Sequence, residues 1–189
     1  GNYIFPNSIA VGQFYNVSYD FAVPYNVCGG LQDNGSWCGP SRRRGPITNV
    51  HWFNSGGGDG FHTAQDPTDP NIIYSESQGG NMVRIDRVTG ETMSIRPQPQ
   101  PGEAVLRWNW DTPLYMSPHD PKIIYAASNK LFRSANRGLT WESVGPDLTA
   151  NANRDDVVTM GVKGSDITIA KNDGIVAWPT IISVGESIK

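Results

Sequence analysis

Carboxylates and aromatic side chains occur together in several short polar segments of this 189-residue chain. Asp33 lies in the sequence QDNG, Asp59 lies in GGGDG, and Asp111 directly follows Trp110. Carboxylates bind hydroxyl groups or carry acid-base work, and aromatic faces stack on the C–H surfaces of sugars. These residue types therefore predict a carbohydrate-binding site.

Asp59 and Asp33 are the candidates for a catalytic role. The predicted ligand-binding residues are Gln32, Asp33, Asn34, Asp59, Trp108, Trp110, Asp111, Asp173 and Trp178. Asp33 and Asp173 also lie close to glycines in turn sequences, which favours a structural role for each. Trp108 and Trp110 alternate as strand residues do, so we expect at least one of them in the core.

The other chemistry-bearing residues argue against several classes of function. The histidines, His51, His62 and His119, lack metal-ligand spacing, so neither a metal nor a cofactor is expected. The glycine run at 56–60 lacks the Lys-Ser/Thr pair of a phosphate loop, and no G-x-S-x-G motif is present.

Charge and hydropathy bear on the kind of partner. The net charge is −3 and the pI is about 5.5, so no nucleic-acid partner is expected. Arg42, Arg43 and Arg44 form the only basic cluster, which we interpret as a solvated loop rather than a phosphate site. No apolar stretch approaches the ~20 residues of a membrane-spanning helix, so no membrane span is expected.

The chain contains an internal repeat. The sequence DPTDPNIIY at 66–74 returns as SPHDPKIIY at 117–125, and a weaker third copy begins at Pro24. The spacing between Pro24, Pro70 and Pro121 is close to the ~40–50 residues of one propeller blade. The 21 glycines and 14 prolines also argue against a helical bundle.

The predicted fold is an all-β partial β-propeller with about three four-stranded antiparallel blades and the first strand of a fourth, in one domain of residues 1–189. Blade one is expected at about 13–53, with strands at 14–19, 25–31, 36–39 and 47–53. Blade two is expected at about 60–95, with strands at 61–65, 72–76, 82–86 and 91–95. Blade three is expected at about 113–149, with strands at 114–117, 123–127, 131–134 and 140–144. A loop at 150–172 precedes the start of blade four at about 173–189, with a strand at 180–184.

Such an open array leaves the outer faces of its first and last blades exposed to solvent. Propellers usually close with four to eight blades. We therefore expect the remaining blades to be supplied by a longer chain or by another propeller.

The strand order sorts the turns onto two ends of the blades. If the first strand of each blade is innermost, turns between second and third strands share one end with the connections between blades. Asp33, Asp59, Asp111 and Asp173 are then expected to ring that end of the central channel. Three tryptophans are expected beside them, namely Trp108, Trp110 and Trp178.

The segment SANRGLTW at 134–141 nearly matches the turn motif S-x-D-x-G-x-T-W. Asn136 can hydrogen-bond the turn backbone, Gly138 can take positive φ, and Trp141 can cover the hairpin. Ser134 and Thr140 complete the motif. The topology places this turn at the end away from the carboxylates, so its predicted role is structural.

The two cysteines, Cys28 and Cys38, flank the turn sequence DNG at 33–35. A two-residue turn at 34–35 would set Cys38 opposite Leu31 and Cys28 opposite Ser41, with the sulfurs on opposite faces. A longer or bulged turn would bring the sulfurs together, so the sequence leaves the disulfide open.

Taken together, several segments resemble the Asp-box (BNR) repeat β-propellers related to sortilin and to xyloglucanase-type glycoside hydrolases. They are GGLQDNGS at 29–36, GGDGF at 57–61, WDTP at 110–113, SPHDP at 117–121 and PDLT at 146–149, with the Asp-box itself at 134–141. The most similar group consists of bacterial secreted proteins described as sortilin-like or glycosyl-hydrolase-like. The resemblance implies a secreted, periplasmic or cell-surface protein whose signal peptide would lie outside this sequence.

The resemblance implies two alternative functions. In the sortilin branch the propeller binds peptides in its tunnel without chemistry, which favours a non-catalytic recognition domain for a peptide or glycan. In the hydrolase branch, two Asp residues from opposing propellers act as acid and base. The alternative is therefore part of a xyloglucanase-like glycoside hydrolase, to which Asp59 or Asp33 would contribute one carboxylate. A scaffold that only docks other subunits is a third interpretation.

Overall fold

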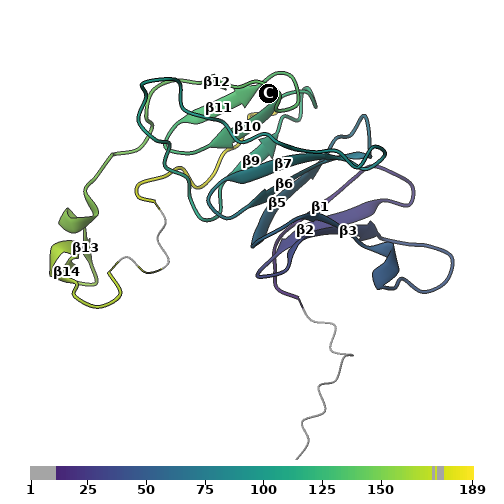
Figure 1. Ribbon diagram of the computed structural model, residues 1–189, viewed down its shortest axis with the longest axis horizontal. Helices are drawn as coiled ribbons and strands as arrows, with labels where there is room; N and C mark the ends of the chain where they lie inside the picture. Colours follow the sequence, from purple (N-terminus) through teal and green to yellow (C-terminus); the bar gives the residue numbers. More distant parts are fainter. Residues whose placement is uncertain (1–11, 172, 174–176) are drawn as a thin grey trace, which may run out of the picture.

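Three four-stranded antiparallel sheets follow one another in the computed structural model, which describes residues 12–171, 173 and 177–189 (Figure 1). The first contains β1 (Phe14–Tyr19), β2 (Asn26–Leu31), β3 (Gly35–Pro40) and β4 (Phe53–Gly56). The second contains β5 (Gly60–Gln65), β6 (Ile72–Ser77), β7 (Asn81–Asp86) and β8 (Thr92–Ser94). The third contains β9 (Leu114–Met116), β10 (Ile124–Ala127), β11 (Leu131–Ser134) and β12 (Glu142–Ser143). Within each sheet every strand pairs with the next one in sequence, which confirms the predicted all-β partial β-propeller.

Short elements complete the described part of the chain. β13 (Val158–Thr159) and β14 (Val162–Lys163) form a two-stranded sheet inside the segment predicted to be a loop. The 3-10 helices are η1 (Asn49–His51), η2 (Arg154–Asp156) and η3 (Gly164–Asp166). None of the helices within these described ranges has the length and hydropathy needed to cross a bilayer.

Two predicted strands are wrong. The strand expected at 47–53 forms at Phe53–Gly56 instead, because Thr48 and His51 exchange local hydrogen bonds that hold η1. The strand expected at 180–184 does not form, although this segment lies against the third sheet and the Ile181 amide donates to the Ser128 carbonyl at 2.9 Å.

The β2–β3 hairpin has a longer turn than the two-residue alternative. Leu31 pairs with Gly35, and Cys28 lies directly opposite Cys38. The turn lengthens because Asp33 adopts a left-handed conformation, with φ of 58°. The sulfurs therefore lie on the same face and form a disulfide.

The core is built on both faces of β6, an inner strand of the second sheet. Ile72 and Tyr74 pack in a cluster with Leu114 and Ile124 of the third sheet. Ile73 points the other way and packs against the disulfide of the first sheet. This alternation is what a strand buried between two sheets requires.

The first and second sheets approach each other backbone to backbone. A Cβ placed on Gly30 would lie 2.1 Å from the carbonyl carbon of Gly60, and one on Gly60 would lie 2.5 Å from the carbonyl oxygen of Gly35. Only glycine fits at such distances. This close approach brings the turn that carries Asp33 next to the segment that carries Asp59.

Candidate functional site

Three of the predicted carboxylates lie at one end of the sheets. We call Asp33, Asp59 and Asp111, together with Tyr15 and His62, the acidic end. Tyr15 is 41% exposed. Its pKa is raised mainly by partial loss of solvent around the phenol, and the negative charges of Asp59, Asp33 and Asp111 raise it further. The three carboxylates come from different loops, which hydrogen bonds join to one another.

The Asp33 side of the acidic end is held by contacts between turns. The Asp33 amide donates to Oδ1 of Asp59 at 2.6 Å, and the Asp59 amide donates to Oε1 of Gln78 at 2.7 Å. The Gln78 amide returns a hydrogen bond to the Asp59 carbonyl at 3.2 Å. Asn34 tightens its own turn by donating from its side chain to the Gln32 carbonyl.

The Asp111 side is held in a similar way. The Gly79 amide donates to the Trp110 carbonyl at 3.2 Å, and the Asp111 amide donates to Oδ1 of Asn109 at 3.1 Å. The Asp111 carboxylate lies 3.2 Å from Nε2 of His62, an ion pair when the imidazole is protonated. Turns of the first two sheets and the connections between consecutive sheets thus fix the positions of the carboxylates.

A buried carboxyl, Glu76, lies beneath the acidic end and was missed by the sequence analysis. It is 1% exposed, and its Oε1 accepts from the Thr112 amide at 3.3 Å. Burial, followed by the charge of Asp111, raises the pKa of Glu76 to about 10, so this carboxyl is neutral at pH 7. The only signal in the sequence was an ionisable residue inside the strand sequence IIYSES.

The predicted aromatic residues separate in the structure. Trp110 is 39% exposed beside Asp111, whereas Trp108 is 4% exposed and packs in the core between Phe132 and the Arg96 guanidinium. Asp173 and Trp178 are exposed, and no contact within the described ranges joins either of them to the acidic end. Of the three predicted tryptophans, Trp110 is thus the exposed one that directly precedes a carboxylate of the acidic end in the chain.

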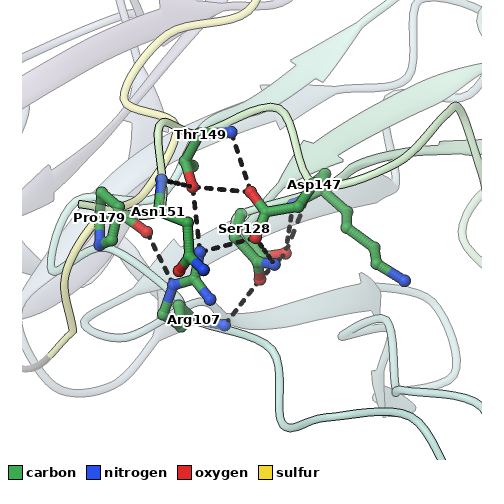
Figure 2. Close-up of polar contacts among 8 residues, drawn as sticks. Arg107, Ser128, Asp147, Thr149, Asn151 and Pro179 are labelled. Carbon is green, nitrogen blue, oxygen red and sulfur yellow. Dashed lines mark hydrogen bonds and ion pairs between the residues drawn. The ribbon is translucent and has the colours of Figure 1, made fainter. Parts of the chain in front are cut away.

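A second polar cluster, also missed from the sequence, joins the third sheet to the C-terminal segment (Figure 2). Arg107 donates from Nη2 to Asp147 at 2.7 Å and to the Thr149 hydroxyl at 3.0 Å, and from Nε to the Pro179 carbonyl at 3.0 Å. Asn129 also donates to Asp147, at 3.0 Å. Because every one of these groups binds another part of the chain, the cluster has a structural role.

The 134–141 turn is held by hydrogen bonds of its own side chains and of its neighbours. The Thr140 amide donates to Oδ1 of Asn136 at 2.9 Å, and Gly138 has φ of 84°. The Trp141 indole donates to the Ile95 carbonyl at 2.7 Å, and Arg137 reaches the buried Asp66 carboxylate at 2.6 Å. These contacts tie the third sheet to the second.

Within the described part of the chain, no group of three or more His, Cys, Asp or Glu side chains is arranged to hold a metal ion. The carboxylates of the acidic end offer hydrogen-bond acceptors and negative charge.

Comparison with solved structures finds similar chains, and one of them is a glycoside hydrolase. The chain is similar to the GH74 xyloglucanase from Xanthomonas campestris at 16% identity and a TM-score of 0.44, over 69% of this chain and 20% of that chain. It therefore spans about a fifth of the length of that structure. No family model matches the sequence, and no curated protein matches it.

Proposed function

We propose that this chain is a recognition segment of a secreted β-propeller protein, which binds a glycan or a peptide at the acidic end without cleaving it. The observation that carries the proposal is the convergence of Asp33, Asp59 and Asp111 from different loops beside Tyr15 and Trp110. Carboxylates supply directed acceptors for hydroxyl or amide groups, and the two exposed rings supply apolar faces.

Recognition is favoured over hydrolysis by the position of the neutral acid. A glycosidase needs one protonated carboxyl in contact with the glycosidic oxygen and a second one roughly 5–10 Å away. Glu76 has the raised pKa that such an acid requires, but at 1% exposure it cannot touch a substrate. Asp59 is engaged in holding the Asp33 turn through Oδ1.

Two observations support the proposed setting of the protein. The Cys28–Cys38 disulfide fits an oxidising compartment, as in a secreted or cell-surface protein. Phe14, Val17 and Tyr19 are exposed on the first strand of the first sheet. Further blades, on a longer chain or another propeller, would cover such apolar side chains.

The test is to incubate the protein with a panel of polysaccharides and peptides and to measure both retention and release of new reducing ends. Retention without release is expected, and Asp59→Asn, which keeps the acceptor for the Asp33 amide, should also release nothing. Release by the wild type that is lost in Asp59→Asn would replace this proposal by the glycoside hydrolase alternative. Absence of any retention would favour the scaffold interpretation.

A further inference from the structure

The first sheet carries a basic groove at the end opposite to the acidic end. Residues 23–25 and 41–44 line it, and its volume is about 830 Å³. It lies where Asn26 pairs with Pro40, whereas the Asp33 turn closes the other end of the same hairpin. Strands of this length separate the two ends by about 17 Å. The groove is therefore distinct from the acidic end.

The arginines of the groove are available to an external anion. Arg42, Arg43 and Arg44 are all exposed, and Arg43 donates from Nη1 to the Pro46 carbonyl at 2.9 Å. Among the described residues, Arg42 and Arg44 make no side-chain hydrogen bond or ion pair. A guanidinium binds carboxylate or sulfate through two parallel N–H donors.

Among the described residues, the buried Asp20 carboxylate forms no ion pair with these arginines. Asp20 is 3% exposed and accepts from the Ala22 amide at 3.1 Å, from the Asn26 amide at 2.7 Å and from the Asn26 side chain at 2.6 Å. Its acceptor capacity is thus used within the turn that leads from β1 to β2.

The same turn presents an aromatic wall. Tyr25 is 49% exposed, and its ring lies 6.2 Å from that of Tyr19, edge to face. The Ser41 amide donates to the Tyr25 carbonyl at 2.9 Å, so the start of the arginine loop is held beside this ring. The Cys28–Cys38 disulfide joins β2, which follows Tyr25, to β3, which leads into the arginine loop. The groove therefore combines a fixed aromatic side with arginines.

We infer that this groove binds an acidic polysaccharide, with Arg42 and Arg44 on its carboxylate or sulfate groups and Tyr25 against a sugar ring. Tyrosine provides the apolar face that the C–H side of a sugar requires, and the arginines provide charge at separate positions. Nucleic acid, which places a charge about every 1.7 Å along a duplex, needs a broader basic surface than three arginines on a chain of net charge −3.

The probe for the test is an oligogalacturonate, compared with a neutral cello-oligosaccharide of equal length, in calorimetric titrations at low and high salt. We expect binding of the acidic oligosaccharide that weakens with salt, and weaker or no binding of the neutral one. R42Q/R44Q should lower the affinity at least about ten-fold, because a ten-fold change corresponds to the loss of one charge-assisted hydrogen bond. K122Q/K189Q removes the same charge from exposed lysines and should change the affinity less than about two-fold.

Other outcomes would overturn the inference. Equal affinity of R42Q/R44Q and wild type, or no binding of either oligogalacturonate or a sulfated oligosaccharide, would exclude the groove as the site. Tighter binding of poly-glutamate or of a single-stranded oligonucleotide would replace the glycan by that partner. If R42Q/R44Q does not fold, R42K/R44K, which keeps the charge but loses the planar fork, must bind more weakly than wild type. Variants of the acidic end should not affect this binding, so a negative result for one of the two proposed sites leaves the other untouched.

Discussion

At the scale of single residues, Asn136 shows which property of a turn residue matters here. Its Oδ1 accepts from the Thr140 amide at 2.9 Å, and its Nδ2 donates to the Thr140 hydroxyl at 2.8 Å. Neither contact needs a negative charge. An amide can therefore stand where the motif has aspartate, because the turn requires an acceptor and not a carboxylate.

Substitutions at Asn136 test this directly. Asn136→Ala leaves the Thr140 amide without its acceptor and should cost about 1 kcal/mol. For a chain of this size that corresponds to a fall in Tm of about 2–4 °C in thermal denaturation. Asn136→Asp keeps the acceptor and should stay within about 0.5 kcal/mol of wild type. Equal loss in both variants would mean that the acceptor does not stabilise the turn.

At the scale of elements, the C-terminal segment shows how a stretch without strand pairing can still be fixed to a sheet. Arg107 holds the Pro179 carbonyl while it binds Asp147 and Thr149 (Figure 2). Further along, the Tyr125 hydroxyl donates to Glu186 at 2.9 Å. The segment predicted as a strand at 180–184 therefore lies on the third sheet through side-chain contacts and the backbone hydrogen bond from Ile181 to Ser128, without forming a strand ladder.

The Asp147 contacts predict a pH dependence of stability. The pKa of Asp147 lies below its usual range, mainly because the Thr149 hydroxyl donates to its carboxylate. Hydrogen bonds from Asn129 and Arg107 lower this pKa further. Because the folded pKa lies below the unfolded value of about 3.9, this stabilisation is full at pH 7 and is lost as the pH falls below about 4.

Asp147→Asn should therefore lower the Tm at pH 7 by about 2–4 °C, which corresponds to about 1 kcal/mol for this partly exposed carboxylate. The difference from wild type should shrink between about pH 4 and pH 2. Asp173→Asn, at an exposed carboxylate, is the matched control and should leave the Tm unchanged. A Tm difference for Asp147→Asn that does not change with pH would contradict the assigned charge interactions.

Elements with a repeated pattern were predicted well from the sequence, and elements fixed by local polar contacts were not. β6 follows from the repeated sequence IIY, because alternating side chains fill the cores on both its faces. The strand expected at 47–53 failed, since the Thr48–His51 contacts that form η1 have no periodic pattern. The strand order predicted that Asp33 and Asp59 lie at the same end of the sheets, and the close glycine contact that joins them was not predicted. Glu76 was not predicted because it lies within an ordinary strand sequence.

At the scale of the whole molecule, the two ends of the first sheet differ in charge. Asp33 and Asp59 of the acidic end lie at one end of this sheet, and the three arginines of the basic groove lie at the other. Figure 1 shows the sheets side by side along the chain, so the loops of three sheets can share one end of the propeller. This arrangement follows from the strand order, in which consecutive strands pair and the same kind of turn recurs at the same end.

The central claim is that the acidic end binds a ligand, and retention on glycan and peptide arrays tests it most directly. The variant W110A/D111N removes one carboxylate charge of the acidic end and the exposed ring that precedes it in the chain. The control W178A/D173N makes the same changes at exposed residues that no described contact joins to it. We expect W110A/D111N to lose at least about ten-fold in affinity for the retained ligand and the control less than about two-fold. Equal retention by W110A/D111N and wild type, or a loss confined to W178A/D173N, would contradict the claim.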